Sequence, residues 1–143
     1  MPDSVFKEVK LSKIIETQIK TIKILDNKIK VFYKNKFKEV RINCDENQIG
    51  RVLLNILKNS YESSEKKNKV ISVQVLIEKK LIVIIIEDNG TGFPENRDKL
   101  FEPYITNKIN GTGLGLAICK KIIEDHGGEI NLLDSEELSL IHI

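Results

Sequence analysis

The chain has 143 residues, a length typical of one domain, and a net charge of +2. Hydrophobic residues make up 41% of it and charged residues 31%, an ordinary globular composition that excludes a general preference for nucleic acid or membranes. The two cysteines lie far apart and outside any CxxC spacing, which disfavours a zinc or thioredoxin-type site and indicates a reducing cytoplasm. No apolar run approaches the roughly 20 residues that span a bilayer, so we expect a soluble, cytoplasmic single domain over residues 1–143.

The N-terminal third of the chain predicts one helix followed by two short strands. Residues 11–25 carry apolar side chains at helical spacing, with lysines between them. Ser12 is a candidate N-cap for this helix, and Asp26 begins the turn that ends it. Residues 28–34 and 38–44 alternate between apolar and polar side chains, so we expect them to pair as a hairpin.

A second helix follows, and its polar residues are arranged in an unusual way. Asp45 is its predicted N-cap, Gln48 completes a capping box, and the helix extends to about Glu62 or Ser63. One broad face is apolar. The opposite narrow stripe consists of Arg51, Asn55, Asn59 and Glu62. Asparagine is a poor helix former, so two of them at an i, i+4 spacing indicate either a solvated face or a role in binding.

The C-terminal half predicts a third helix and four strands. Lys79 and Lys80 separate two strands that we expect to be antiparallel neighbours, and Gly127 with Gly128 stops a helix over residues 113–126. The strands of this half are residues 70–78, 80–88, 129–133 and 138–143. The whole pattern predicts an α+β fold, a two-layer sandwich of a mixed, mostly antiparallel sheet packed on about three helices.

Two glycine-containing segments hold candidate binding residues. In EDNGTGF, Asp88 follows a buried strand, where its carboxylate can accept a hydrogen bond from a ligand amino group; a tight turn explains the same residues without a ligand. In GTGLGLAICKKI, a glycine-rich loop opens a helix, an arrangement that binds phosphate through backbone amides. The polar segment ITNKIN before it is a candidate lid. Lys108 in this lid is either a cation for a terminal phosphate or a solvated lysine.

In this order, the segments resemble the motifs of the GHKL ATPase superfamily, most closely those of the catalytic ATP-binding domain of sensor histidine kinases. NILKNSYE resembles the N box, EDNGTGF the G1 box, KLFEPYITNK the F box and GTGLGLAICKKIIEDHGGEI the G2 box. The resemblance covers about residues 40–133. The opening MPDSVFKEVKLSKII, the form NILKNSYES and the short lid are similar to the nitrogen-regulation branch of these kinases. This resemblance implies the Bergerat ATP-binding fold, with ATP and Mg²⁺ as cofactors.

The resemblance also implies roles for individual positions. Asn59 would hold Mg²⁺ against the triphosphate with Asn55 supporting it, Asp88 would accept the adenine amino group, and Lys108 would act with the two asparagines as a catalytic group. Ser63 stands where many relatives have an aromatic residue on the adenine, so that stacking contact is expected to be missing. The remaining implied contacts to nucleotide are Gly90, Gly92, Phe101, Thr106, Gly111, Thr112, Gly113, Leu114, Gly115 and Leu116, with Ile86 or Ile118 touching the adenine.

Position 55 discriminates between reactions. ATP-hydrolysing and serine-phosphorylating members generally carry a glutamate there, whereas an asparagine amide is no general base at neutral pH. We therefore expect a protein-histidine kinase domain that binds Mg-ATP and donates the γ-phosphate to a histidine on a separate dimerisation domain, in two-component signal transduction with a downstream response regulator. The alternatives are a nucleotide-sensing module without phosphotransfer and an anti-sigma serine kinase.

The phosphoacceptor is expected to lie outside these residues. His126 ends a helix, where it would cap carbonyls, and His142 is the penultimate residue; neither sequence resembles a phosphoacceptor helix. We expect the dimerisation domain and the sensor region to be absent from residues 1–143, and the isolated domain to bind ATP with little activity by itself. It would be the soluble part of a membrane-anchored sensor, with no contact to nucleic acid or membrane.

Overall fold

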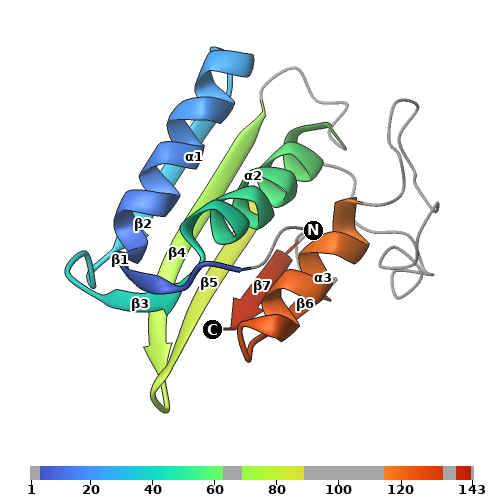
Figure 1. The fold of residues 1–143 in the computed structure, drawn as a ribbon. Helices are drawn as coiled ribbons and strands as arrows, with labels where there is room; N and C mark the ends of the chain where they lie inside the picture. Colours follow the sequence, from blue (N-terminus) through green and yellow to red (C-terminus); the bar gives the residue numbers. More distant parts are fainter. Residues whose placement is uncertain (1–3, 63–68, 89–114, 134–137, 143) are drawn as a thin grey trace.

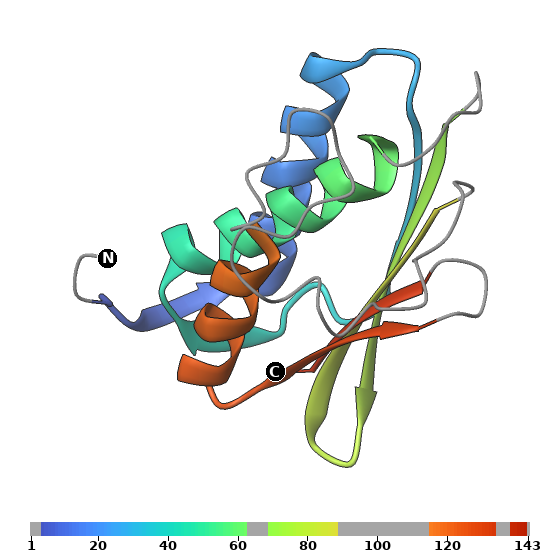
Figure 2. The same ribbon diagram turned by 90° about the vertical axis from the view of Figure 1, so that its right-hand side faces the viewer.

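The computed structural model describes residues 4–62, 69–88, 115–133 and 138–142, and it places them in two layers (Figure 1). Helices α1 (Leu11–Leu25), α2 (Glu46–Glu62) and α3 (Gly115–Asp125) lie on one face of a five-stranded sheet, as the turned view shows (Figure 2). A second, two-stranded sheet pairs β1 with β3. The strands are β1 (Lys7–Lys10), β2 (Lys30–Asn35), β3 (Arg41–Cys44), β4 (Val70–Glu78), β5 (Leu81–Asp88), β6 (Glu129–Leu133) and β7 (Leu138–His142).

The large sheet has the order β2-β4-β5-β7-β6. β2 runs parallel to β4, and the other neighbouring pairs are antiparallel. Val73 pairs with Ile86 and Val75 with Ile84, and these side chains are buried in one core with those of the helices. The predicted α+β sandwich with a mixed, mostly antiparallel sheet is confirmed. None of the helices in the described ranges combines the length and the apolarity that a bilayer crossing requires.

The predicted hairpin of residues 28–34 and 38–44 is wrong. β2 pairs with β4, and β3 pairs with β1. After β2, the Asn35 Oδ1 accepts the backbone N–H of Phe37 at 2.7 Å, and the chain turns from there into the smaller sheet. Alternation identified both strands but did not specify their partners. The nine-residue β4 pairs with all six residues of β2, which the four-residue β3 is too short to do.

The start of α1 also differs from its prediction. Its N-cap is Lys10, which makes no side-chain capping bond within the described part of the chain. Ser12 lies inside the first turn and is buried, and its hydroxyl donates to the Lys38 carbonyl oxygen at 2.9 Å. Ser12 is therefore not the cap, because its hydroxyl ties α1 to the turn before β3. The predicted end of the helix is confirmed, since α1 ends at Leu25 and Asp26 is its C-cap.

Two turns depend on left-handed backbone. Lys79 and Lys80 connect β4 to β5 with φ of 48° and 69°, the conformation that two-residue hairpins require and that side chains with a Cβ disfavour. After α3, Gly127 has φ of 78° and donates to the Glu124 carbonyl oxygen, while Gly128 donates to that of Ile123, both at 2.9 Å. These are the two bonds of a Schellman motif, so the predicted glycine stop is confirmed.

Candidate nucleotide-binding site

Helix α2 separates apolar from polar side chains as predicted. Arg51 is exposed, whereas Asn55 and Asn59 are half-buried, so the asparagine stripe is not a fully solvated face. The side chain of Glu62 lies outside the described residues. The buried face consists of Ile49, Val52, Leu53, Ile56 and Leu57.

Asn55 is held against α3 by a cysteine. Its Nδ2 donates to the Cys119 Sγ at 3.7 Å, and that Sγ lies 4.0 Å from the Val52 carbonyl oxygen, to which the thiol donates. Cys119 is fully buried, and burial raises the pKa of its thiol to about 11, so the group is a neutral thiol at physiological pH. Sequence reasoning considered Cys119 only as a candidate for a zinc site, a thioredoxin-type site or a disulfide, and it missed this contact. Its helical spacing from the buried Ile122 and Ile123 was the available signal that it faces the core.

The contacts between α2 and α3 show that the two helices run in opposite directions. Asp45, directly before α2, contacts His126, directly after α3, and Asn55 contacts Cys119 further along. One more turn along α2 reaches Asn59, and one turn back along α3 reaches Gly115, the first residue of that helix. Asn59 and the start of α3 therefore lie toward the same end of the helix pair.

Strand β5 contains two further residues that were predicted to contact nucleotide. Ile86 is buried on the helix side of the sheet, and Asp88 is the last residue of the strand, paired with Ile71 of β4. The prediction that Asp88 stands where a buried strand ends is confirmed for its backbone; its side chain lies outside the described residues. Ile118 is half-buried and packs against the core.

The glycine-rich segment opens a helix as predicted, since Gly115 and Leu116 are the first two residues of α3. The free backbone amides and the positive end of the dipole belong to this terminus. The other predicted positions lie outside the described residues: Ser63, Gly90, Gly92, Phe101, Thr106, Lys108, Gly111, Thr112, Gly113 and Leu114. So does the candidate lid.

At the other end of the helix pair, Asp45 holds the start of α2. Its Oδ1 accepts the backbone N–H of Gln48 at 3.1 Å, as predicted for an N-cap, and its Oδ2 accepts the backbone N–H of Val5 at 2.8 Å. The bond from Val5, followed by the bond from Gln48, holds the pKa of the Asp45 carboxyl below its ordinary value. The other bond of the predicted capping box, from the Asp45 N–H to the Gln48 side chain, is wrong. The Asp45 N–H donates instead to the His126 Nε2 at 3.1 Å, and the Gln48 Oε1 accepts the Ser4 hydroxyl at 3.1 Å.

His126 closes the same end of α3. Because its Nε2 accepts the N–H of Asp45, the ring proton belongs on Nδ1, which donates to the Ile122 carbonyl oxygen at 2.7 Å. The predicted capping of a carbonyl by His126 is confirmed. Phe6 stacks on the imidazole, with ring centroids 4.6 Å apart and planes inclined by 26°. Residues 4–6, which we call the N-terminal latch, thus contact both the start of α2 and the end of α3.

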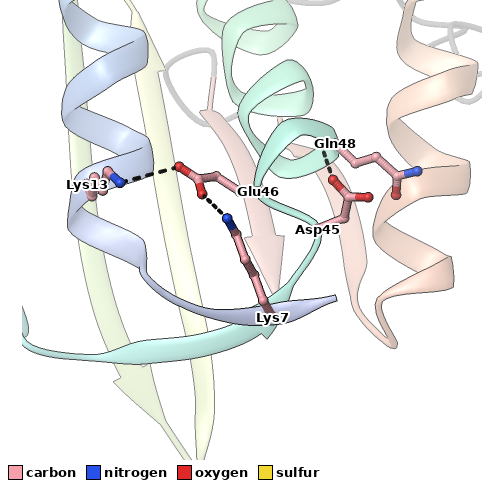
Figure 3. A network of polar contacts seen from close by, with 5 residues as sticks. All are labelled: Lys7, Lys13, Asp45, Glu46 and Gln48. Carbon is pink, nitrogen blue, oxygen red and sulfur yellow. Dashed lines mark hydrogen bonds and ion pairs between the residues drawn. The ribbon is translucent and has the colours of Figure 1, made fainter. Parts of the chain in front are cut away.

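Glu46 adds ion pairs beside the latch (Figure 3). Its two carboxylate oxygens lie 3.4 Å from the Lys7 Nζ and 3.8 Å from the Lys13 Nζ, so one side chain links α2 to β1 and α1. The lysine side chains are more than half exposed, and such pairs contribute about 0–1 kcal/mol. The pairs therefore add less to stability than the hydrogen bonds of Asp45.

Comparison with known proteins agrees with this arrangement. Residues 44–140 match the family described as histidine kinase-, DNA gyrase B-, and HSP90-like ATPase. A sensor histidine kinase of Rickettsia bellii described as NtrY-like is 35% identical over 138 residues, which cover 95% of this chain and 23% of that protein. The nitrogen regulation protein NtrY of Azorhizobium caulinodans is 45% identical over 100 residues, which cover 65% of this chain and 13% of that protein.

Solved structures give the same result. The catalytic domain of histidine kinase ThkA superposes with a TM-score of 0.85 at 30% identity, over 97% of this chain and 95% of that one. ThkA in complex with the response regulator protein TrrA gives a TM-score of 0.80 at 26% identity, over 96% of this chain and 41% of that one.

The chain belongs to the family of histidine kinase-, DNA gyrase B- and HSP90-like ATPases, and its fold is that of histidine kinase catalytic domains. The resemblance to the nitrogen-regulation branch is confirmed by the relatives named above. The chain spans 23% of the length of the Rickettsia relative and 13% of the Azorhizobium one.

Proposed function

We propose that this chain is the catalytic domain of a sensor histidine kinase of the nitrogen-regulation branch, which binds Mg-ATP and donates its γ-phosphate to a histidine on a separate dimerisation domain. The observation that carries the proposal is the antiparallel pairing of α2 and α3, which brings Asn59 and the amide-bearing start of α3 toward one end of the helix pair. The phosphorylated histidine would then supply a response regulator, the class of protein that ThkA binds in its complex.

The residues of this region fit magnesium that arrives with a nucleotide. Within the described ranges, no group of three or more His, Cys, Asp or Glu side chains forms a metal site. The carboxamide oxygen of Asn59 is a neutral, hard ligand, suited to an octahedral cation that keeps waters and phosphate oxygens as its other ligands. Bound Mg²⁺ would neutralise charge on the triphosphate, while Asn59 would hold it and the amides at the start of α3 would bind phosphate oxygens.

Asn55 supports histidine over serine or water as the acceptor. Phosphoryl transfer needs mostly positioning and charge neutralisation, and an imidazole acceptor is already a nucleophile. A serine or water acceptor needs a general base, but Asn55 uses its carboxamide N–H to bind the Cys119 Sγ and carries no titratable group. This disfavours the anti-sigma serine kinase as an alternative.

The nucleotide-sensing module remains the second candidate, and one experiment distinguishes it. ATP affinity is measured by calorimetry with Mg²⁺ and with a chelator, and phosphate transfer is measured to a supplied dimerisation domain, for the parent, Asn59→Ala and Asn47→Ala. Asn47 is an exposed asparagine at the opposite end of α2 and serves as the matched control.

We expect Asn59→Ala to lose magnesium-dependent affinity and transfer, with metal-free binding little changed, while Asn47→Ala behaves as the parent. An equal response to Mg²⁺ in the parent and Asn59→Ala contradicts the metal role. Nucleotide binding by the parent without any transfer to the supplied histidine favours the sensing module.

A further inference from the structure

A buried cysteine between two helices is usually a small apolar filler. Cys119 differs because its sulfur connects two polar groups of the neighbouring helix. Its Sγ accepts the Asn55 Nδ2 at 3.7 Å and donates to the Val52 carbonyl oxygen at 4.0 Å. Val52 and Asn55 are three residues apart, so they are neighbours on the surface of α2. The thiol of Cys119 therefore bonds to both of them from α3.

The direction of these bonds fixes the orientation of the Asn55 carboxamide. The thiol has one hydrogen, and the Val52 carbonyl can only accept, so the S–H is directed to that oxygen. The sulfur then presents lone pairs to Asn55, and only the Nδ2 end of the carboxamide can donate to them. Because the carboxamide is planar, its Oδ1 lies on the side away from Cys119. A rotated amide would either place two acceptors in contact at a half-buried position or take the S–H away from the Val52 carbonyl oxygen.

We infer that Cys119 is a positioning residue, which holds the carboxamide of Asn55 in one orientation next to Asn59 in the nucleotide site. The inference rests on the proposed function for its effect on nucleotide, but not for the contact itself. Cys119 need not touch the nucleotide. It acts by restricting the rotation of Asn55, so that the Asn55 Oδ1 faces away from Cys119 before nucleotide arrives.

The test compares two replacements of Cys119 with a matched control. Cys119→Val fills the position with an apolar side chain one heavy atom larger that offers no acceptor, whereas Cys119→Ser restores a group that can accept from Asn55 and donate to Val52. Cys44 is the other fully buried cysteine, and it lies in β3, so Cys44→Val controls for the loss of a buried thiol. Thermal unfolding followed by circular dichroism selects variants that fold; Cys119→Ala replaces Cys119→Val if the latter does not.

The first measurement is the NMR signal of the Asn55 side-chain amide in the nucleotide-free protein. We expect Cys119→Val to shift this signal and speed its hydrogen exchange, and Cys119→Ser and Cys44→Val to retain slow exchange. An unchanged Asn55 signal in Cys119→Val overturns the inference. This measurement does not require nucleotide binding, so it stands even if the proposed function fails.

The second measurement is a double-mutant cycle on magnesium-dependent ATP affinity. Cys119→Val should weaken it by about two- to tenfold, the range that one neutral hydrogen bond supports, and Cys119→Ser should recover most of the loss. In the Asn55→Ala background, Cys119→Val should have no further effect. An equal loss in both backgrounds shows that Cys119 acts through packing alone and overturns the positioning role. If the parent binds no ATP, the proposed function is wrong, and the NMR result alone decides the contact.

Discussion

Replacing Asp45 with alanine removes two hydrogen bonds, one that caps the start of α2 and one that connects it to the N-terminal latch. The bond to the Gln48 N–H is an N-cap, whose loss typically costs about 1 kcal/mol. The bond to the Val5 N–H involves a carboxylate and is worth about 1.5–3 kcal/mol when buried, but Val5 is 71% exposed and its amide can rehydrate, so we assign it about 1 kcal/mol. Asp45→Ala should therefore lower the free energy of unfolding by about 2 kcal/mol.

Urea unfolding followed by circular dichroism measures this change, with Asp26→Ala as the control. Asp26 also accepts a backbone N–H, from Lys28 at 3.0 Å, but that bond stays within one turn, so its loss should cost less than about 1 kcal/mol. A loss at Asp45 no larger than the loss at Asp26 refutes the reasoning. It would mean that the bond between the latch and α2 adds nothing to the stability of the fold.

The effect of Asp45→Ala on the free energy of unfolding should depend on pH. The pKa of Asp45 is lowered in the folded protein, first by the bond from Val5, relative to an ordinary value of 3.8. The stability that this carboxylate adds is therefore present above pH 3.8 and is lost as the pH falls through the lowered value. The difference in unfolding free energy between parent and Asp45→Ala should be constant near neutral pH and should narrow in acid. A difference that does not change with pH contradicts the charged role of Asp45.

Three further changes test separate parts of the fold and site. The double change Lys79→Asn with Lys80→Gly should raise the unfolding free energy by about 1 kcal/mol, because Asn-Gly adopts the observed turn without strain; no gain in urea unfolding would contradict this. Gly127→Ala should lower the free energy of unfolding by about 1 kcal/mol because of its φ of 78° alone, since a Cβ there meets no atom of the described residues within 4 Å. Gly128 lies outside the left-handed region, so Gly128→Ala should lower the free energy of unfolding less in the same assay. Asp88→Asn should weaken ATP binding by at least a few-fold, because its amide can present a donor to the adenine amino group, and calorimetry that finds equal ATP and GTP affinity in the parent would exclude this role.

Local periodicity predicted the helices and strands well, since it depends on which side of each element is buried. The five residues that the 3.6-residue period places on one face of α2, Ile49, Val52, Leu53, Ile56 and Leu57, are all buried, and the glycine stop after α3 has the expected hydrogen bonds. The partner of β2 could not be predicted in this way. Alternation in a strand shows that it has two unlike faces but contains no information about which strand lies beside it.

The site shows the same division between local and long-range information. Asn55, Asp88 and Gly115 occupy the helix, strand end and helix start that the motifs predicted. The contact of Asn55 with Cys119, 64 positions away in the chain, depends on how two helices pack, and local spacing indicated only that Cys119 faces the core. The capping box failed for the same reason, because His126, 81 positions from Asp45, took the hydrogen bond that the local pattern had assigned to Gln48. The roles of the predicted site residues toward nucleotide stay predictions.

The N-terminal latch has a thermodynamic consequence for the nucleotide site. It contacts α2 and α3 at one end of the pair, while Asn59 and the start of α3 lie toward the other, so nucleotide bound at the proposed site would be coupled to docking of the latch through the relative position of the same two helices. Binding equilibria coupled through a shared element are reciprocal. If docking of the latch changes the affinity for nucleotide by a certain factor, nucleotide would change the docking equilibrium of residues 4–6 by the same factor. Chain segments joined to this latch would then sense the occupancy of the site through the helix pair, without any contact with the nucleotide.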